Sequence, residues 1–390
     1  MKLRPAHLLT GAIFVMVLAY AMAKCLLSVV MSDMIDEFAL QGSTQGFLSS
    51  ASSAGALCSL LSMFLLQGRV SKKTMLALSA LLLMAVLCVI GLTSSFPMLL
   101  LLLLMQGAAM GYLEAYMNAM VVDLNGDQSG PALNLLHVFF GIGGLGSAFA
   151  VQAVAQSTGW RASYFLIAAV VLCALTLFLW MHRKRSSEAG AVKELSFSPR
   201  DAAAFFSDRI NLLLLLSLLL YCSFQSGAFT WLSRYITTEL SAPQYAAVGL
   251  GCYWTGTITC RLLSARSKLD PIKRLLAGMF LAGAAHCTGI LMHSVLSVCL
   301  GTLLLGLAGG LCVPTLTNAI ARHNVGRTAL ASSCVSIMNF TAGILMPVMM
   351  ASLAGVTSLH TAMLLPGAAA VLAGCALAVY HFFLREKHAA

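Results

Sequence analysis

Long apolar runs recur along the whole chain, and they constrain its fold more than any other feature. A run of about 20 residues, rising 1.5 Å per residue as a helix, crosses the hydrocarbon core of a bilayer. Only 9% of the 390 residues are charged, compared with about 25% in soluble domains, so a water-soluble fold would lack a polar exterior. The runs lack the period-two alternation of strands, and open sheet edges cannot face lipid. We expect an all-α integral membrane protein with twelve transmembrane helices, at residues 8–31, 43–67, 73–93, 96–122, 131–156, 162–181, 209–232, 243–263, 271–291, 294–319, 328–353 and 358–384.

The longest hydrophilic stretch lies in the middle of the chain, at 182–208, and separates six expected helices from six others. It predicts an N-terminal six-helix half at 1–181, a cytoplasmic linker at 182–208 and a C-terminal six-helix half at 209–390. The halves are similar in sequence at a spacing of about 200, which places Asn118 over Asn318. Parallel repeats of six helices are a known transporter plan, so we expect two six-helix pseudo-repeats.

The basic residues indicate how the chain is oriented. With the N-terminus in the cytoplasm, only Arg161 and Arg234 fall outside and only Lys24 lies within a helix. Cytoplasmic loops of membrane proteins are enriched in Lys and Arg, so we expect a multi-pass protein of the bacterial inner membrane with both termini cytoplasmic. The remaining 20 of the 23 basic residues then lie inside: Lys2, Arg4, Arg69, Lys72, Lys73, Arg183, Lys184, Arg185, Lys193, Arg200, Arg209, Arg261, Arg266, Lys268, Lys273, Arg274, Arg322, Arg327, Arg385 and Lys387.

Other chemistry is excluded by what the sequence lacks. The nine histidines show no ligand spacing, and the 12 cysteines form no Cys-x-x-Cys pair, so we expect no metal site and no cofactor. Neither a hydrolase nor a phosphate-binding motif occurs, which argues against an enzyme. Because the basic residues lie in loops between apolar runs, nucleic acid is not an expected partner. We expect a monomer whose partners are the bilayer and a small-molecule substrate.

Two charges deep within expected spans are the strongest functional candidates. Glu114 is the one acid, and Lys24 the one cation, placed far from the ends of a run. A charge in the hydrocarbon costs roughly 2.5–3.5 kcal/mol on insertion scales, so such residues usually face a wet cavity or a partner. We predict that Glu114 binds substrate and carries the coupled proton.

The whole chain resembles the major facilitator superfamily. The resemblance rests on twelve expected helices, the six-plus-six repeat, the basic central loop and the basic loop Gly68-Arg69-Val70-Ser71-Lys72-Lys73 between the second and third helices. A narrower resemblance, to the fucose/galactose/glucose:proton symporter branch, lies in Gly111-Tyr112-Leu113-Glu114-Ala115, Asn118, Asn134-Leu135-Leu136-His137 and Phe140-Gly141-Ile142-Gly143. That branch has an aspartate in its first helix, whereas this chain has Lys24 there.

The resemblance implies which helices line the central cavity, namely the first, fourth, seventh and tenth. Helical spacing then gathers polar residues on shared faces of these helices and of the fifth and eleventh. The alternative for each polar side chain is an interhelical hydrogen bond. Three basic residues, Arg69, Lys72 and Arg261, are expected to act in conformational loops. The expected substrate-binding residues are Lys24, Glu114, Asn118, Tyr20, Asn134, His137, Tyr221, Gln225, Trp231, Asn318 and Asn339.

Three functions compete at this point. The favoured one is a secondary active transporter that takes up a small polar solute, a sugar or sugar acid, by proton-coupled alternating access. The proton gradient would then be its energy source, making the process symport. The alternatives are a drug or lipid efflux antiporter and a non-transporting membrane receptor. Efflux members often carry a proline in a glycine-rich fifth helix, and none occurs between Ala132 and Gln156.

The role of Lys24 stays open between substrate binding and a counter-ion for Glu114. From the expected ends of the runs, Lys24 lies about 24 Å along its helix and Glu114 about 12 Å along its own. This difference in depth favours substrate binding, because a lysine side chain closes only part of such a gap.

The orientation yields a direct prediction. A reporter fused after Ala390 should be active only in its cytoplasmic form, because 20 of the 23 basic residues then lie inside. Paired cytoplasmic and periplasmic reporters measure this. A fusion active only in the periplasm would contradict both the helix count and the direction.

Overall fold

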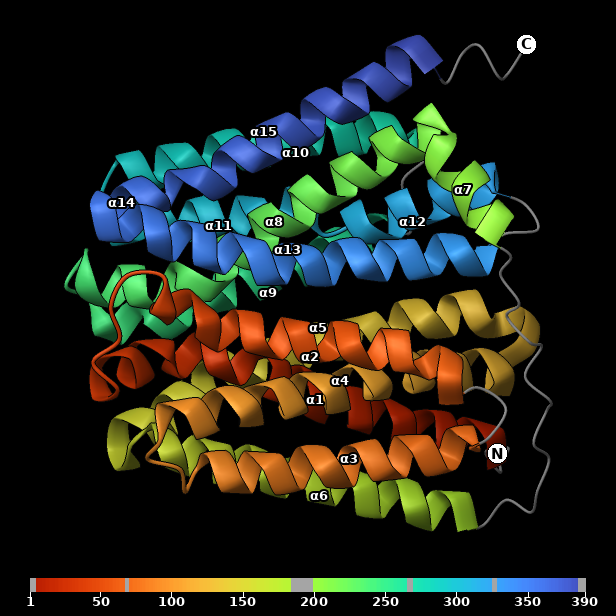
Figure 1. The fold of residues 1–390 in the computed structure, drawn as a ribbon, viewed down its shortest axis with the longest axis horizontal. Helices are drawn as coiled ribbons and strands as arrows, with labels where there is room; N and C mark the ends of the chain where they lie inside the picture. The colour runs from red at the N-terminus through yellow and green to blue at the C-terminus, as the bar shows by residue number, and fades with distance from the viewer. Residues whose placement is uncertain (1–4, 67–69, 184–198, 265–268, 325–327, 385–390) are drawn as a thin grey trace. The chain divides into compact units, whose positions relative to one another are not determined.

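The computed structural model describes residues 5–66, 70–183, 199–264, 269–324 and 328–384, and these residues form helices without a strand (Figure 1). The first part of the chain contains α1 (Pro5–Glu37), α2 (Thr44–Leu66), α3 (Lys72–Ile90), α4 (Phe96–Asn125), η1 (Gly126–Gln128), α5 (Ser129–Thr158) and α6 (Trp160–Arg183). The second part contains α7 (Pro199–Ser207), α8 (Arg209–Thr238), η2 (Pro243–Tyr245), α9 (Ala246–Ser264), α10 (Pro271–Leu291), α11 (Val295–Gly309), α12 (Cys312–His323), α13 (Thr328–Val356), α14 (Leu359–Ala362), α15 (Leu364–Val379) and η3 (Tyr380–Leu384).

The helices agree with the expected all-α membrane fold. Eleven segments of the described residues are long and apolar enough to cross a bilayer. The run expected at 243–263 is present as helix α9 but is not among those eleven. The linker expected at 182–208 lies largely outside the described residues, and its last part forms the short helix α7.

The chain divides into two compact units. Unit 1 consists of Met1–Ala39 and Ala51–Glu194, and unit 2 consists of Leu40–Ser50 and Leu195–Ala390. In unit 1, α1 packs against α4, α5 and α6, while α3 packs against α4 and α6. Helices α3 and α6 accordingly lie side by side in Figure 1.

Unit 2 repeats this scheme six membrane spans later. Helix α8 packs against α13 and α15 as α1 packs against α5 and α6, while α10 packs against α11 and α15 as α3 packs against α4 and α6. Two units built to one pairing plan agree with the six-plus-six pseudo-repeat expected from the sequence.

A pair of glycines in each unit lets two helices approach until their backbones touch. In unit 1, a Cβ on Gly55 would lie 1.8 Å from Leu104 O, and a Cβ on Gly107 would lie 1.8 Å from Ser52 O, so α2 and α4 meet reciprocally. In unit 2, Gly256 and Gly306 make the matching contact between α9 and α11. A Cβ on either glycine would lie 2.3 Å from a carbonyl oxygen of the other helix. Membrane helices commonly associate through small residues in this way.

Helix continuity is interrupted in two of the expected spans, and the run expected at 358–384 divides at Met363 into α14 and α15. The run expected at 294–319 forms α11 and α12, which are separated by a turn at Gly310–Leu311. The freed carbonyls are satisfied by side chains, since Tyr221 Oη donates to Gly309 O at 2.7 Å and Arg261 Nε donates to Gly310 O at 3.3 Å. Buried backbone groups in a membrane need such partners.

Hydrogen bonds between polar side chains hold the N-terminal end of α8 in place. Asn211 and Asn324 exchange amide hydrogen bonds of 3.1 and 2.7 Å, tying the start of α8 to the end of α12. Asp208 caps α8 and accepts a hydrogen bond from His323 Nε2 at 2.9 Å. Partial burial would raise the pKa of Asp208. The hydrogen bond from His323 and two from backbone N–H groups outweigh burial and hold that pKa below its ordinary value.

The glycine contacts predict which small residues tolerate a methyl group. Gly107→Ala and Gly306→Ala should each destabilise the protein by about 1–3 kcal/mol, because the new Cβ meets backbone that cannot move aside. Gly146→Ala is the control, since a Cβ there meets nothing within 4 Å. Thermal melting of the purified variants measures the effect. Equal melting temperatures for Gly107→Ala and Gly146→Ala would contradict the close approach.

Candidate functional site

The predicted site residues of unit 1 meet between α1 and α4. Tyr20 and Lys24 lie one turn apart on α1, so their side chains share a face. Glu114 lies in the middle of α4 and faces them. Its carboxylate accepts hydrogen bonds from Tyr20 Oη and from Lys24 Nζ, the latter at 3.2 Å, and Lys24 Nζ also lies 3.0 Å from Tyr20 Oη. The three side chains therefore form one closed polar cluster, called the triad below.

The triad retains access to its surroundings. The side chains of Lys24 and Glu114 keep 35% and 37% of their accessible surface, whereas Tyr20 is 2% exposed. The pair is therefore neither sealed in the helix packing nor fully solvated.

The depth argument against a Lys24–Glu114 pair is wrong. Helix α4 continues to Asn125, whose Nδ2 donates to Thr10 Oγ1 at 3.2 Å, so these two residues lie level. From that level Lys24 lies about 21 Å along α1 and Glu114 about 16 Å along α4. Helical side chains also tilt toward the N-terminus, which carries the ammonium of Lys24 back toward Glu114. The error came from placing the helix ends by hydropathy alone.

Helix α5 contributes an aromatic ring that sequence reasoning did not select. The ring of Phe140 lies 5.7 Å from Lys24 Nζ and 5.8 Å from the ring of Tyr20. A cation over an aromatic face is stabilised by the ring quadrupole. The available signal was spacing, since Phe140 lies three residues after His137. His137 in turn is close enough to Glu114 to act on its charge.

The two predicted asparagines of unit 1 differ in environment. Asn118 lies one turn beyond Glu114 on α4, and its buried Oδ1 has no hydrogen-bond partner among the described residues. Asn134 on α5 is exposed. A buried amide oxygen without a partner is costly, so Asn118 has unused capacity to accept a hydrogen bond beside the triad.

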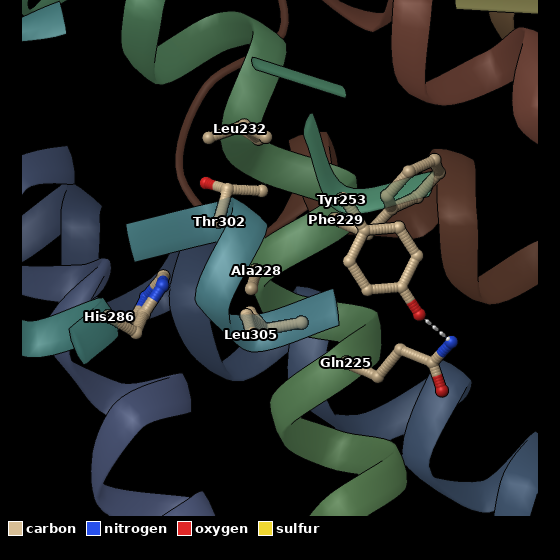
Figure 2. A pocket seen from close by; sticks show the side chains of 8 residues that line it. All are labelled: Gln225, Ala228, Phe229, Leu232, Tyr253, His286, Thr302 and Leu305. Atoms are coloured by element: carbon tan, nitrogen blue, oxygen red, sulfur yellow. Dashed lines mark hydrogen bonds between the residues drawn. The ribbon is translucent and has the colours of Figure 1, made fainter. Parts of the chain in front are cut away.

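In unit 2, Gln225 on α8 lies at a small pocket. Its amide donates to the hydroxyl of Tyr253 on α9, and both line the pocket with His286 from α10 and Thr302 from α11 (Figure 2). Figure 2 shows His286 across the pocket from the Gln225–Tyr253 bond. Its Nε2 lies 2.8 Å from Met363 O. Tyr253 was not selected from the sequence, because nothing in the spacing of α9 singles it out.

The other predicted residues of unit 2 are dispersed. Tyr221 is buried and bonded to Gly309 O, as described above. Trp231 is completely buried and is absent from the pocket lining. Asn318 on α12 is exposed and Asn339 on α13 is half-buried.

The two polar clusters are related by nearly the same sequence shift as the glycine contacts of the two units. A shift near 201 carries Tyr20 to Tyr221 and Lys24 to Gln225. Both tyrosines bridge equivalent helices, α1 to α4 in unit 1 and α8 to α11 in unit 2. The repeat therefore keeps the tyrosine bridge, while a neutral glutamine takes the place of the lysine.

The predicted loop residues fall into three situations. Lys72 at the start of α3 forms an ion pair with Asp123 near the end of α4. Arg261 at the end of α9 holds the carbonyl of Gly310. Arg69 lies outside the described residues.

Comparison with known proteins gives consistent findings. Residues 12–285 match the family described as the Major Facilitator Superfamily. No curated protein matches the chain by sequence. A bacterial homologue of the human lysosomal transporter Spinster, in an inward-facing and unoccupied conformation, is similar with a TM-score of 0.77 and 13% identity, covering 97% of each chain.

Two other solved structures have comparable folds. The nucleoside transporter NupG has a TM-score of 0.76 and 13% identity, covering 97% of this chain and 100% of its own. The E. coli fucose:proton symporter FucP has a TM-score of 0.67 and 17% identity, covering 96% of this chain and 99% of its own. At these identities the likeness shows a shared fold. The family and the fold are those of a transporter rather than of an enzyme.

The triad predicts an energetic coupling between its two charges. Lys24→Met keeps the aliphatic stem but leaves Glu114 without its counter-ion, and should destabilise the protein by about 1–3 kcal/mol. This cost lies between that of losing an exposed ion pair and that of breaking a buried one, because each side chain is about one-third exposed.

The double variant Lys24→Met, Glu114→Gln should lose less stability than the sum of the two single variants. Thermal melting of all four proteins completes the cycle. Strict additivity would contradict a stabilising pair.

Proposed function

Because this chain belongs to the Major Facilitator Superfamily, we propose that it takes up a small polar solute, a sugar or sugar acid, by proton-coupled alternating access. The single observation that carries the proposal is the triad, in which a carboxylate shares its charge with one lysine and one tyrosine. A secondary active transporter needs a group whose proton or counter-ion can be exchanged, and Glu114 is such a group.

The coupling step follows from the geometry of the triad. Lys24 neutralises Glu114 while both remain reachable. A proton that binds Glu114 replaces this counter-ion and frees the ammonium of Lys24. The freed ammonium then attracts an anionic group on the solute, so binding of the proton and of the solute favour each other. Tyr20, which contacts both charges, keeps a hydrogen-bond partner in either state.

Charge balance favours a sugar acid within the proposed solute class. A solute carboxylate on Lys24, together with a proton on Glu114, leaves no charge unpaired, whereas breaking this partly exposed pair without replacement is unfavourable. The amide of Asn118, which has an acceptor oxygen to spare, can bind a solute hydroxyl. The motif in α4 and α5 that resembles the sugar:proton symporters supports the same class.

The proposal includes the setting of the protein. The transporter would lie in a bacterial inner membrane as a monomer, with both termini in the cytoplasm. The proton gradient would supply its energy, and no cofactor would take part. The distribution of Lys and Arg supports this orientation.

The solute can be found with the purified protein. A thermal-shift screen against sugars, sugar acids, organic acids and cationic drugs should give stabilisation by sugar acids, since only a ligand that binds the folded state raises its stability. Stabilisation by cationic drugs alone would replace the proposal with the efflux alternative.

With the solute in hand, the coupling role of Glu114 becomes testable. Glu114→Gln should abolish uphill uptake driven by a pH gradient in proteoliposomes, because glutamine cannot release a proton. The same variant should retain exchange of labelled for unlabelled solute, because glutamine keeps the shape of the protonated acid. The control is Asp33→Asn, which removes an exposed carboxylate of the same unit. Uphill uptake by Glu114→Gln at the wild-type rate would remove Glu114 from coupling.

A further inference from the structure

Three polar side chains from three separate segments converge in unit 2, at the opposite end of α8 from Asp208. Tyr235 lies near the end of α8, His293 lies in the turn between α10 and α11, and His360 lies at the start of α14. The distances among Tyr235 Oη, His293 Nδ1 and His360 Nδ1 are 2.9, 3.2 and 3.5 Å. Three potential lone-pair donors therefore form one small triangle, called the outer triangle below.

Hydrogen bonds alone do not account for all three short distances. The nitrogen His360 Nδ1 has one in-plane lone pair, yet it lies 2.9 Å from the tyrosine oxygen and 3.2 Å from His293 Nδ1. If Tyr235 donates to it, His293 Nδ1–H can donate only to the tyrosine oxygen, at 3.5 Å, and the 3.2 Å separation of the two nitrogens has no hydrogen bond of its own. If His293 donates, the tyrosine hydroxyl is left with Ile290 O at 3.5 Å. One cation in the middle uses the lone pairs of all three atoms at once.

The dimensions of the outer triangle match a tetrahedral metal site. Nitrogen and oxygen ligands lie at about 2.0–2.1 Å from zinc, so two tetrahedral ligands lie about 3.3 Å apart. The three observed edges of 2.9, 3.2 and 3.5 Å bracket this value. We propose that Tyr235, His293 and His360 bind one divalent transition-metal ion of the zinc class, with the fourth position open to water and with the hydroxyl proton of Tyr235 released to solvent on binding.

The surroundings of the outer triangle suit an ion that arrives from solution. His293 is exposed, His360 is half-buried and Tyr235 is buried, so the site has an open side and a fixed base. His293 has a φ of 46°, a left-handed conformation that is uncommon for residues other than glycine and is compatible with a functional constraint.

Sequence spacing could not reveal this site. Among the described residues, no group of three or more His, Cys, Asp or Glu side chains is placed to hold a metal ion, and here a tyrosine completes the set. His293 and His360 are far apart in sequence and meet only because their segments end at the same level of unit 2. Imidazole ligands favour Zn²⁺, Ni²⁺ and Cu²⁺ over Mg²⁺ and Ca²⁺. A bound ion would tie together the end of α8, the turn after α10 and the start of α14.

The test is zinc binding by the tag-free, full-length protein in detergent, titrated with ZnCl₂ by calorimetry. Wild type should bind one equivalent with micromolar affinity, and MgCl₂ should not compete. His293→Ala and His360→Ala should each weaken binding by at least about tenfold, since even a group that only orients a ligand contributes 10–100-fold to affinity. Tyr235→Phe, which keeps the ring, should weaken binding while leaving the histidine pair. The matched control is His323→Ala, because His323 is an exposed histidine of the same unit that pairs with Asp208 instead.

Two further measurements keep the test decisive. If an alanine variant does not fold, His293→Gln and His360→Gln replace the imidazole with a poorer ligand of similar polarity. X-ray absorption at the zinc edge should show two imidazole ligands and no sulfur. Sulfur ligation would assign the ion to some of the 12 cysteines and overturn the proposal. Unchanged affinity in the His293→Ala, His360→Ala double variant would overturn it as well.

Discussion

The structure depends on how closely its helices can approach one another. In a bilayer, helices gain nothing by hiding apolar side chains from lipid, so association relies on close contact and on a few polar bonds. The reciprocal contact of Gly55 and Gly107 provides such contact in unit 1, and that of Gly256 and Gly306 provides it in unit 2. Single hydroxyls add cross-links, as Ser217 Oγ does on Ala373 O at 2.7 Å. The triad and the outer triangle are built upon helices positioned in this way.

Against this shared framework, the difference between the units is one of charge. Unit 1 places Lys24 and Glu114 together, and in unit 2 the position that corresponds to Lys24 is Gln225, which bonds to Tyr253 on α9 instead. The tyrosine that bridges to the fourth helix of each unit is retained in both. The two units thus share their helix packing, and the Lys24–Glu114 ion pair of unit 1 has no counterpart at the Gln225–Tyr253 bond of unit 2.

The sequence predicted the helices and the repeat well, because long apolar runs and basic loops leave few alternatives. It also selected Lys24 and Glu114, since charges within such runs are rare. It misjudged their separation, because hydropathy ends α4 too early and the level of Asn125 against Thr10 is a tertiary fact. The outer triangle could not be predicted from the sequence for a similar reason. Metal-site rules depend on short ligand spacings, and contacts between distant segments leave no such pattern.

The turn that separates α11 from α12 has a mechanical consequence. A continuous helix resists bending because its backbone bonds must lengthen or break. At Gly310–Leu311, the carbonyls of Gly309 and Gly310 are held instead by Tyr221 and Arg261, which come from two other helices. A change in the angle between α11 and α12 would therefore strain these two side-chain hydrogen bonds, while the backbone hydrogen bonds within each helix would stay intact. The angle between α11 and α12 thus depends on two side chains of α8 and α9 rather than on an unbroken run of backbone hydrogen bonds.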